Sequence, residues 1–399
     1  MVSSVYIAKN VYGGDGLGRL GDGRVAFVPG AFAGEQVKAE IVEERRGYVK
    51  TRLVEVVEAS PARTGFATAP VPGMVYSNLS FEGELEAKAA QLEEMLYRAH
   101  LVHPEAKMIK APLKELNYRN KAVYHFALSG SKMLFGYMAE SSHDIVDIAK
   151  DPLAADAMNF ALPSIRADVE KLLTRGAPAV RADVAKKEKV TVRWSERSGV
   201  RWWLGQDAPA GVILENTRGR IFEVPADGFY QVNPAAADAL VAAVAERAAA
   251  AKPSEIIDLY CGVGVFGIVS AGLAAAPLRG VESNPAAVRS AVRNAAKNGV
   301  EASFATDRTA HALKKMRFAP GAAVIADPPR GGMEKGVAAA IARSGAAKVF
   351  YVSCDGATFV RDLKELSSAY EIEEILWIDM FPRTAKFESL AVLSKKEGR

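Results

Sequence analysis

The segment Asp258-Leu-Tyr-Cys-Gly-Val-Gly-Val-Phe-Gly267 decides the fold of the C-terminal part of the chain. It overlaps an apolar stretch, residues 255–260, that is typical of a buried β-strand. Glycines at this point let the backbone turn sharply from a strand into a helix and let a ligand approach closely. The pattern predicts a ligand site at the carboxyl end of a first strand, although a single Gly-x-Gly pair would suit a dinucleotide equally well.

Strands and helices alternate around this segment. An alanine-rich helix is expected ahead of it, over residues 234–250. Strands are expected over residues 255–260, 278–283, 302–306, 322–327, 348–353, 371–380 and 389–394. Alternation of this kind favours a doubly wound, mostly parallel α/β sheet of the Rossmann-like type, which we assign to residues 221–399.

Acidic side chains are expected at the ends of three strands of this sheet. Glu282 ends the second strand, where a carboxylate can accept hydrogen bonds from both hydroxyls of a ribose. Asp327 ends the fourth strand in Ala-Asp-Pro-Pro-Arg, where two prolines stiffen the loop. Together with Asp258, this layout resembles that of S-adenosylmethionine-dependent methyltransferases. The alternative is that these carboxylates only cap helices.

The chain has two cysteines, which excludes a disulfide scaffold, a four-cysteine zinc site and an iron–sulfur cluster held by four cysteines. Cys261 lies inside the glycine loop, where a small buried thiol is expected to serve packing. Cys354 follows the strand at 348–353 and is therefore expected at the same sheet edge as the ligand site. There it is a candidate nucleophile, and Glu388, just before the last strand, is a candidate general base.

The N-terminal half reads as two smaller units. Residues 1–58 contain glycine turns and short strands at 25–28, 36–42 and 48–57, which favour a small OB-like β-barrel. The alternative is a glycine-rich structural cap without a ligand. After a linker at 60–73, residues 74–220 are expected to form an α+β domain that begins with a helix at 81–101. Pro163 is expected to interrupt a helix there or to start a second one.

Several motifs, in chain order, resemble the RNA 5-methyluridine (uracil-C5) methyltransferases. The N-terminal segment is similar to the TRAM barrel that many members carry, and the match spans nearly the whole chain. The motifs are Phe229-Tyr-Gln-Val-Asn-Pro234, the Asp258 loop, Asp327-Pro-Pro-Arg-Gly-Gly332, Ser353-Cys354 with Arg361-Asp-Leu363, and Asp379-Met-Phe-Pro382 with Glu388.

This resemblance implies a mechanism and a set of site residues. The Cys354 thiolate would add to carbon 6 of uracil, so that carbon 5 can attack the methyl group of S-adenosylmethionine. Glu388 would then remove the proton from carbon 5. Residues that match the family's S-adenosylmethionine contacts are Gln231, Tyr260, Glu282 and Asp327.

Three departures from the family pattern affect these expectations. Many relatives hold an iron–sulfur cluster, but its ligand positions fall in residues 71–76 and near Asp151, where no cysteine stands, so we predict neither a cluster nor another metal. Asp355-Gly356 stands where Asn-Pro often follows the nucleophile. Arg383 and Lys386 stand where histidine is common. These two cations are expected to lower the pKa of Cys354, to bind a phosphate, or to be solvated.

The charge balance bears on the partner. The formal net charge is only +4, so RNA contact must come from local patches rather than from a global field. Candidate phosphate contacts are Arg45, Arg46 and Lys50 in the barrel, and residues 118–121. The TRAM-like barrel favours 23S ribosomal RNA by analogy, and transfer RNA is the alternative. The sequence shows neither a signal peptide nor an apolar run long enough for a membrane span, so a cytoplasmic location is expected. The protein is also expected to be a monomer.

Three other functions remain as alternatives. Cytosine carbon-5 methylation uses the same thiol addition, but the motif around Glu388 argues against it. An amino-group methyltransferase would usually carry an aromatic residue where Arg330 stands. A non-catalytic RNA-binding assembly factor would be expected to have lost Cys354 or Glu388, and both are present.

Overall fold

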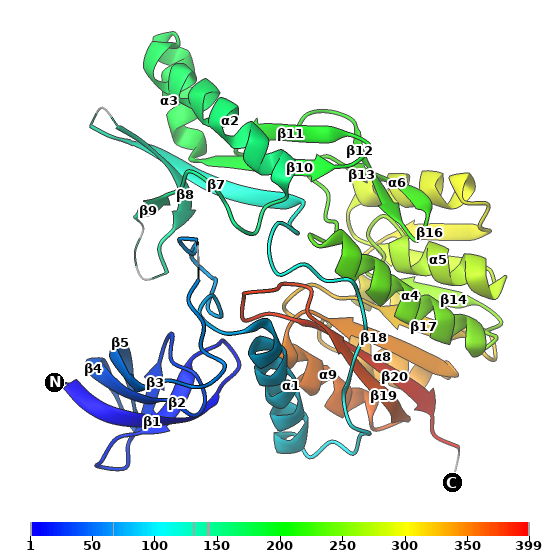
Figure 1. Ribbon diagram of the computed structural model, residues 1–399. Helices are drawn as coiled ribbons and strands as arrows, with labels where there is room; N and C mark the ends of the chain where they lie inside the picture. Colours follow the sequence, from blue (N-terminus) through cyan, green and yellow to red (C-terminus); the bar gives the residue numbers. More distant parts are fainter. Residues whose placement is uncertain (1, 67, 131, 141, 143, 398–399) are drawn as a thin grey trace.

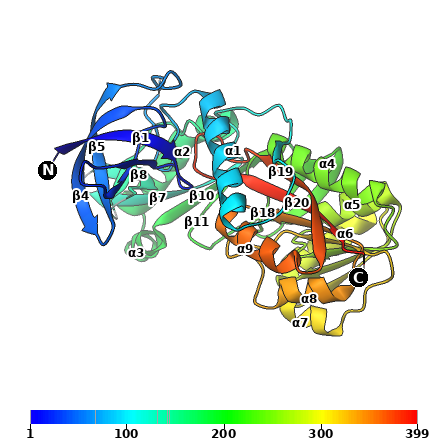
Figure 2. The same ribbon diagram turned by 90° about the horizontal axis from the view of Figure 1, so that it is seen from below.

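The computed structural model describes residues 2–66, 68–130, 132–140, 142 and 144–397. Within them the chain forms a barrel, a central antiparallel sheet with two helices, and a large C-terminal α/β sheet (Figure 1). Figure 2 shows the barrel at one end of the molecule, the C-terminal sheet at the other and α1 (Phe81–Arg98) between them. No helix in the described part of the chain combines the length and the hydropathy that crossing a bilayer requires.

The barrel is closed and has the strand order β1-β2-β3-β5-β4, as the glycine-rich pattern predicts. Alternate apolar side chains such as Val5 and Ile7 of β1 fill its interior. Gly18 is required by close packing, because a Cβ there would lie 2.3 Å from the carbonyl oxygen of Tyr6. The strands are β1 (Val2–Asn10), β2 (Gly16–Arg19), β3 (Val25–Val28), β4 (Gln36–Arg45) and β5 (Tyr48–Glu58).

The central sheet has the order β11-β10-β7-β8-β9, and helices α2 and α3 cover it. A separate hairpin, β12–β13, follows. The elements are β7 (Lys121–Ser129), β8 (Lys132–Met138), β9 (Ile145–Asp147), α2 (Asp156–Arg175), α3 (Pro178–Lys187), β10 (Lys189–Ser195), β11 (Gly199–Leu204), β12 (Val212–Thr217) and β13 (Arg220–Pro225).

Two features of this region differ from expectation. Pro163 lies inside α2 and does not interrupt it, because the apolar face around Leu162 and Ile165 is buried against the central sheet and offsets the lost backbone hydrogen bond. The expected unit 74–220 also groups α1 with the central sheet. In the structure, α1 and the short strand β6 (Lys107–Met108) pack instead on the C-terminal sheet.

The C-terminal sheet has the order β16-β15-β14-β17-β18-β20-β19-β6. Its strands from β16 to β18 are parallel, whereas β20 runs antiparallel to both of its neighbours. The strands are β14 (Ile256–Leu259), β15 (Leu278–Glu282), β16 (Ala302–Thr306), β17 (Ala323–Ala326), β18 (Lys348–Ser353), β19 (Tyr370–Ile378) and β20 (Glu388–Lys395). The helices are α4 (Pro234–Ala250), α5 (Val265–Ala274), α6 (Pro285–Lys297), α7 (Thr309–Lys315), α8 (Val337–Ser344) and α9 (Gly356–Leu366).

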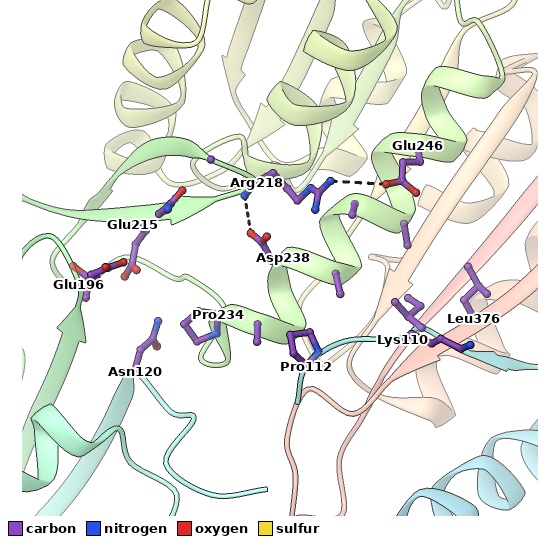
Figure 3. Close-up of a pocket in the computed structure, with 18 of the residues that line it drawn as sticks. Lys110, Pro112, Asn120, Glu196, Glu215, Arg218, Pro234, Asp238, Glu246 and Leu376 are labelled. Atoms are coloured by element: carbon purple, nitrogen blue, oxygen red, sulfur yellow. Dashed lines mark hydrogen bonds and ion pairs between the residues drawn. The ribbon is translucent and has the colours of Figure 1, made fainter. Parts of the chain in front are cut away.

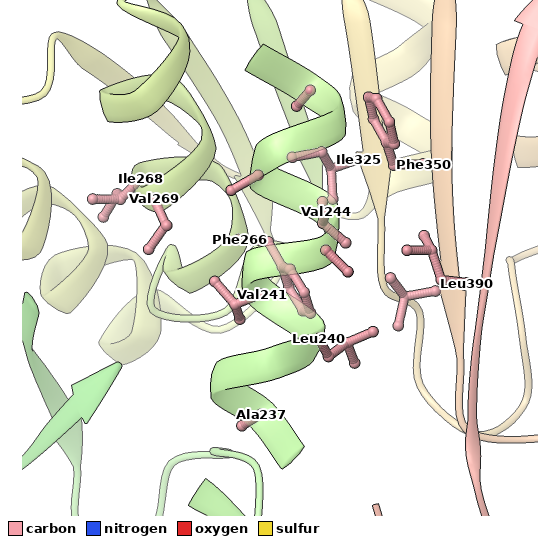
Figure 4. Close-up of a cluster of buried hydrophobic side chains, with 14 of the residues drawn as sticks. Ala237, Leu240, Val241, Val244, Phe266, Ile268, Val269, Ile325, Phe350 and Leu390 are labelled. Atoms are coloured by element: carbon pink, nitrogen blue, oxygen red, sulfur yellow. The ribbon is translucent and has the colours of Figure 1, made fainter. Parts of the chain in front are cut away.

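Helices cover both faces of this sheet. On one face, Leu240 and Val244 of α4 pack with Ile325 and Phe350 (Figure 4). On the other face, α1, α8 and α9 cover the alternate residues of the same strands, such as Val324. Each fully buried aliphatic or aromatic side chain contributes about 1.5–3 kcal/mol, so both faces are closed by packing. The carboxyl edge of the sheet is left for a ligand.

Candidate active site

Adjacent parallel strands bring the predicted site residues to one edge of the C-terminal sheet. Glu282 is the last residue of β15, and Tyr260 follows β14 by one position. Asp327 directly follows β17, and Cys354 directly follows β18. Because β15, β14, β17 and β18 are neighbours in this order, these positions lie along a continuous edge.

The glycine loop is tied to this edge by hydrogen bonds. The amide of Gly267 donates to Oδ2 of the buried Asp258 at 2.9 Å. The amide of Gly262 donates to Oε2 of Glu282 at 3.2 Å. Gly262 has φ 54°, and a Cβ there would meet no atom within 4 Å, so its backbone is open to a ligand. Burial raises the pKa of the Cys261 thiol well above its ordinary value, as expected of a packing residue.

One carboxylate at the edge does hold the start of a helix, because Oδ2 of Asp258 accepts the hydrogen bond of the Gly267 amide in the first turn of α5. Asn233 caps α4 and Asn284 caps α6 with their side chains, whereas α5 begins at Gly264 without a side-chain cap. The carboxylate of Glu282 instead accepts hydrogen bonds from loop amides, including that of Asn284 at 2.7 Å. This arrangement argues against the helix-cap alternative for Glu282 but not for Asp258.

Burial shifts the titration of two of these carboxyl groups. Loss of hydration raises the pKa of Asp258 to about 8, and the charges of Asp327 and Glu282 add to that increase. Burial also raises the pKa of Asp327 to about 7. A cation bound at this edge would stabilise the ionised carboxylates.

The pairing of β18 with β20 brings Cys354 and Glu388 together. Ser353 is paired with Ser389, so the next position on each strand carries the thiol and the carboxyl group. Glu388 is only 2% exposed, and its Oε2 has no hydrogen-bond partner among the described residues. Burial raises the pKa of Glu388 well above its usual range, with a further contribution from Asp327.

Cys354 is half-buried, and its thiol is neutral at physiological pH in this state. Burial, with the nearby Glu388 and Asp327 carboxylates, raises the pKa of Cys354 to about 12. Arg330 is the cation that acts in the opposite direction. Neither Arg383 nor Lys386 is among the charges that shift this pKa most, and the pKa is raised rather than lowered.

Arg383 and Lys386 have other partners. Arg383 is 6% exposed, and its guanidinium donates to the carbonyl oxygens of Tyr76 and Leu79 and pairs with Glu115, so it is not solvated. Lys386 pairs with Asp355, with Nζ and Oδ2 3.0 Å apart. Both residues are held by the protein itself, which also argues against a free phosphate-binding role.

Gln231 lies just before α4, in a segment anchored to the central sheet. Its carbonyl oxygen accepts a hydrogen bond from Nδ2 of Asn120 at 3.3 Å. Nδ2 of Asn233 donates to the carbonyl oxygen of Met380 at 3.2 Å, which links this segment to the loop before Glu388. In the same motif, Tyr230 is buried and bonded to Thr217, whereas Phe229 is 71% exposed.

The region that would carry an iron–sulfur cluster is filled by other groups. Val71 and Met74 pack with Tyr118 and Leu153 in a small apolar cluster. Asp151 accepts hydrogen bonds from the hydroxyls of two tyrosines, at 2.9 Å from Tyr124 and 2.7 Å from Tyr137. Within the described ranges no three histidine, cysteine or acidic side chains form a group that could hold a metal ion. These residues do not fit an iron–sulfur cluster.

A cavity of about 950 Å³ lies elsewhere, along the outward face of α4 and beside the β12–β13 hairpin (Figure 3). Its charged groups are partly paired with one another. The amide of Arg218 donates to Asp238 at 2.6 Å, and its guanidinium lies 3.9 Å from Glu246. None of the six predicted site residues lines this cavity, so it is separate from the edge described above.

Family profiles match both the N-terminal barrel and the C-terminal part of the chain. A family profile described as tRNA (Uracil-5-)-methyltransferase matches residues 176–396, and one described as TRAM domain matches residues 5–54. The 23S rRNA (uracil(1939)-C(5))-methyltransferase RlmD of Pseudomonas savastanoi pv. phaseolicola is 30% identical over 93% of this chain and 89% of its own length. An uncharacterized RNA methyltransferase of Thermosynechococcus vestitus is 27% identical over 96% of this chain and 95% of its own.

A solved structure shows the same overall fold. It is that of Pyrococcus abyssi tRNA (uracil-54, C5)-methyltransferase in complex with S-adenosyl-L-homocysteine. The two structures superpose with a TM-score of 0.75 at 23% sequence identity, over 98% of this chain and 99% of the other.

Proposed function

Because the chain belongs to the tRNA (uracil-5-)-methyltransferase family, we propose that it methylates carbon 5 of a uridine in 23S ribosomal RNA, with Cys354 as nucleophile. Membership makes it an S-adenosylmethionine-dependent RNA methyltransferase. The observation that carries the finer proposal is the adjacency of Cys354 and Glu388 at the sheet edge. The 30% identity to an enzyme named for 23S rRNA supports the choice of RNA.

The residues at the edge fit the methyl donor. S-adenosylmethionine supplies an electrophilic methyl group on a sulfonium cation. The open backbone of Gly262 leaves room for it, and Glu282 is placed to accept hydrogen bonds from a ribose. Asp327, with its raised pKa, prefers a cation nearby. Gln231 and Tyr260 are assigned to the same ligand.

Cys354 and Glu388 have separate roles in the proposed reaction at the uracil ring. The Cys354 sulfur bonds to carbon 6 of uracil, and the electrons of the carbon 5–carbon 6 double bond move toward the carbonyl oxygen at carbon 4. Carbon 5 would then bond to the methyl group of S-adenosylmethionine, whose carbon–sulfur bond would break so that S-adenosylhomocysteine leaves. Glu388 takes the proton from carbon 5, the double bond re-forms, and the bond from Cys354 to carbon 6 breaks.

The neutral Cys354 thiol of the free protein fits an active site in which ligand binding ionises the nucleophile. With a Cys354 pKa of about 12, little thiolate exists before binding. Positive charge at this edge, from Arg330 and from the bound sulfonium, stabilises both the thiolate and the Glu388 carboxylate. We therefore expect the nucleophile to ionise in the complex rather than in the free enzyme.

The test is methylation by the purified protein of RNA from a strain that lacks it. Digestion and mass spectrometry should find 5-methyluridine in 23S ribosomal RNA. Methylation of transfer RNA alone would make the ribosomal substrate wrong, methylcytosine would make the base wrong, and no methylation would favour an assembly factor. The Cys354→Ala variant should be inactive and form no covalent adduct with RNA that contains 5-fluorouridine. The Cys261→Ala variant should still form the adduct.

A further inference from the structure

A turn of the N-terminal barrel reaches the active site. Tyr12 lies between β1 and β2, in a turn closed by a hydrogen bond from the amide of Val11 to the carbonyl oxygen of Asp15 at 2.9 Å. The buried Asn10 braces this turn, donating to the carbonyl oxygens of Gly14 at 3.1 Å and Ala31 at 2.9 Å. The position of Tyr12 is therefore set by the barrel.

The hydroxyl of Tyr12 makes three polar contacts next to the nucleophile. It donates to Oδ2 of Asp355 at 3.2 Å. It accepts hydrogen bonds from the amide of Gly356 at 3.1 Å and from Nζ of Lys386 at 3.0 Å. Lys386 also pairs with Oδ2 of Asp355 at 3.0 Å, so one tyrosine, one lysine and one aspartate form a closed polar cluster.

This cluster acts on the residues that follow Cys354 directly. Oδ1 of Asp355 caps α9 by accepting hydrogen bonds from the amides of Ala357 and Thr358, each at 3.2 Å. Burial of Asp355 works to raise its pKa, but the hydrogen bonds from Lys386 and Thr358 keep the pKa below its ordinary value. The carboxylate therefore stays ionised and can serve the helix and the lysine at once.

A side chain of α1 also packs against the same segment. A Cβ at Gly356 would lie 2.4 Å from Cε of Met95 and 3.4 Å from Cε2 of Tyr12. The ring of Tyr12 also meets the ring of Phe387 edge to face, with centroids 5.9 Å apart. Residues after Cys354 and before Glu388 are thus held by the same barrel side chain.

We propose that Tyr12 is a positioning residue, whose hydroxyl acts with Lys386 to fix Asp355 and the start of α9 and thereby the backbone that carries the Cys354 thiol. This inference rests on the proposed function. It makes the barrel part of the support of the active site. It also accounts for two departures from the family pattern, Asp355-Gly356 and Lys386, which meet in one cluster.

The Tyr12→Phe variant tests this role, because it removes the hydroxyl and keeps the ring. Its matched control is Tyr6→Phe, which changes a tyrosine of β1 that is 58% exposed. At saturating RNA, we expect kcat of Tyr12→Phe to fall about tenfold and its KM for RNA to stay within about twofold. The adduct with 5-fluorouridine RNA should form correspondingly more slowly, and Tyr6→Phe should match the wild type.

A second variant and a second readout keep the test decisive. Lys386→Met should also lower kcat, and the double variant should lose no more than the stronger single variant, since both act through Asp355. In the free protein, the rate at which iodoacetamide alkylates Cys354 should differ from the wild-type rate by about threefold or more in Tyr12→Phe but not in Tyr6→Phe. Unchanged kcat and alkylation, or a raised KM with unchanged kcat, would overturn the inference. If the wild-type enzyme made no 5-methyluridine, the proposed function would fail, while alkylation would still test the placement of the thiol.

Discussion

Cys354, which directly follows β18, lies next to Glu388, the first residue of β20, because Ser353 of β18 is paired with Ser389 of the antiparallel β20. Side chains opposite each other in such a pair lie close enough to interact directly. Glu282, Asp327 and Cys354 lie at the ends of parallel strands, whereas Glu388 lies on β20, which runs antiparallel to both of its neighbours. The antiparallel β20 therefore places Glu388 next to Cys354, which is the arrangement that the proposed reaction needs.

The Glu388→Gln variant should separate the two halves of the proposed reaction. It keeps the shape of the side chain and removes the base, so methyl transfer should proceed while removal of the carbon 5 proton is slowed by about 100-fold or more. A methylated covalent adduct between enzyme and RNA should accumulate and be visible by denaturing electrophoresis and mass spectrometry. Normal turnover by this variant would show that another group is the base.

The Asp258→Asn variant should change how stability depends on pH. The pKa of Asp258 is about 8 in the folded protein, far above that of an unfolded aspartate. Its contribution to stability is therefore fully present at acidic pH and is lost as pH rises toward 8. Relative to Asp258→Asn, the ligand-free wild type should lose up to about 1.4 kcal/mol per pH unit between about pH 5 and pH 8. Urea unfolding at three pH values measures this, and a constant difference between the two proteins would contradict it.

The sequence predicts the edge of the sheet well because periodicity and topology decide it. Alternating strands and helices imply a parallel sheet, and residues after its strands must then meet at one edge, as Glu282, Asp327 and Cys354 do. The barrel and the family assignment are confirmed for the same reason, since glycine turns and ordered motifs are local signals. The catalytic and binding roles of the site residues stay predictions.

Contacts between segments that are far apart in the chain could not be predicted, because no local sequence pattern indicates them. Tyr12 precedes Asp355 by 343 positions, and only the docking of the barrel brings them together. Arg383 was expected near the thiol or in solvent, but tertiary packing buries it beside Glu84. Pro163 likewise follows the packing of α2 rather than its local preference.

A buried ion cluster should be essential for stability. Nζ of Lys88 lies 2.7 Å from Oε1 of Glu84 and 2.7 Å from Oδ1 of Asp379, and all three side chains are fully buried. The Lys88→Met variant leaves Asp379 without this cation and Glu84 with only Arg383, whose Nη1 lies 3.7 Å from Oε2 of Glu84, and we expect it to lose about 3–5 kcal/mol of unfolding free energy. The exposed pair of Arg98 and Glu94 on the same helix is the control, since Arg98→Ala should cost less than about 1 kcal/mol. A comparably small loss in Lys88→Met would mean that the two carboxyl groups are already neutral, and burial does raise the pKa of Glu84 to about 7.

Protein purified without air should contain no stoichiometric iron, because apolar packing replaces the cluster ligands. Val71 and Met74 are 4% and 5% exposed and pack with Tyr118 and Leu153, so burial of apolar side chains holds this segment. Prolonged treatment with an iron chelator should leave the midpoint of urea unfolding unchanged. Met74→Ala should instead lower the unfolding free energy by about 2–5 kcal/mol, the usual cost of emptying a core methionine site. Iron at one cluster per chain, or a chelator-induced loss of stability, would show that the segment binds metal after all.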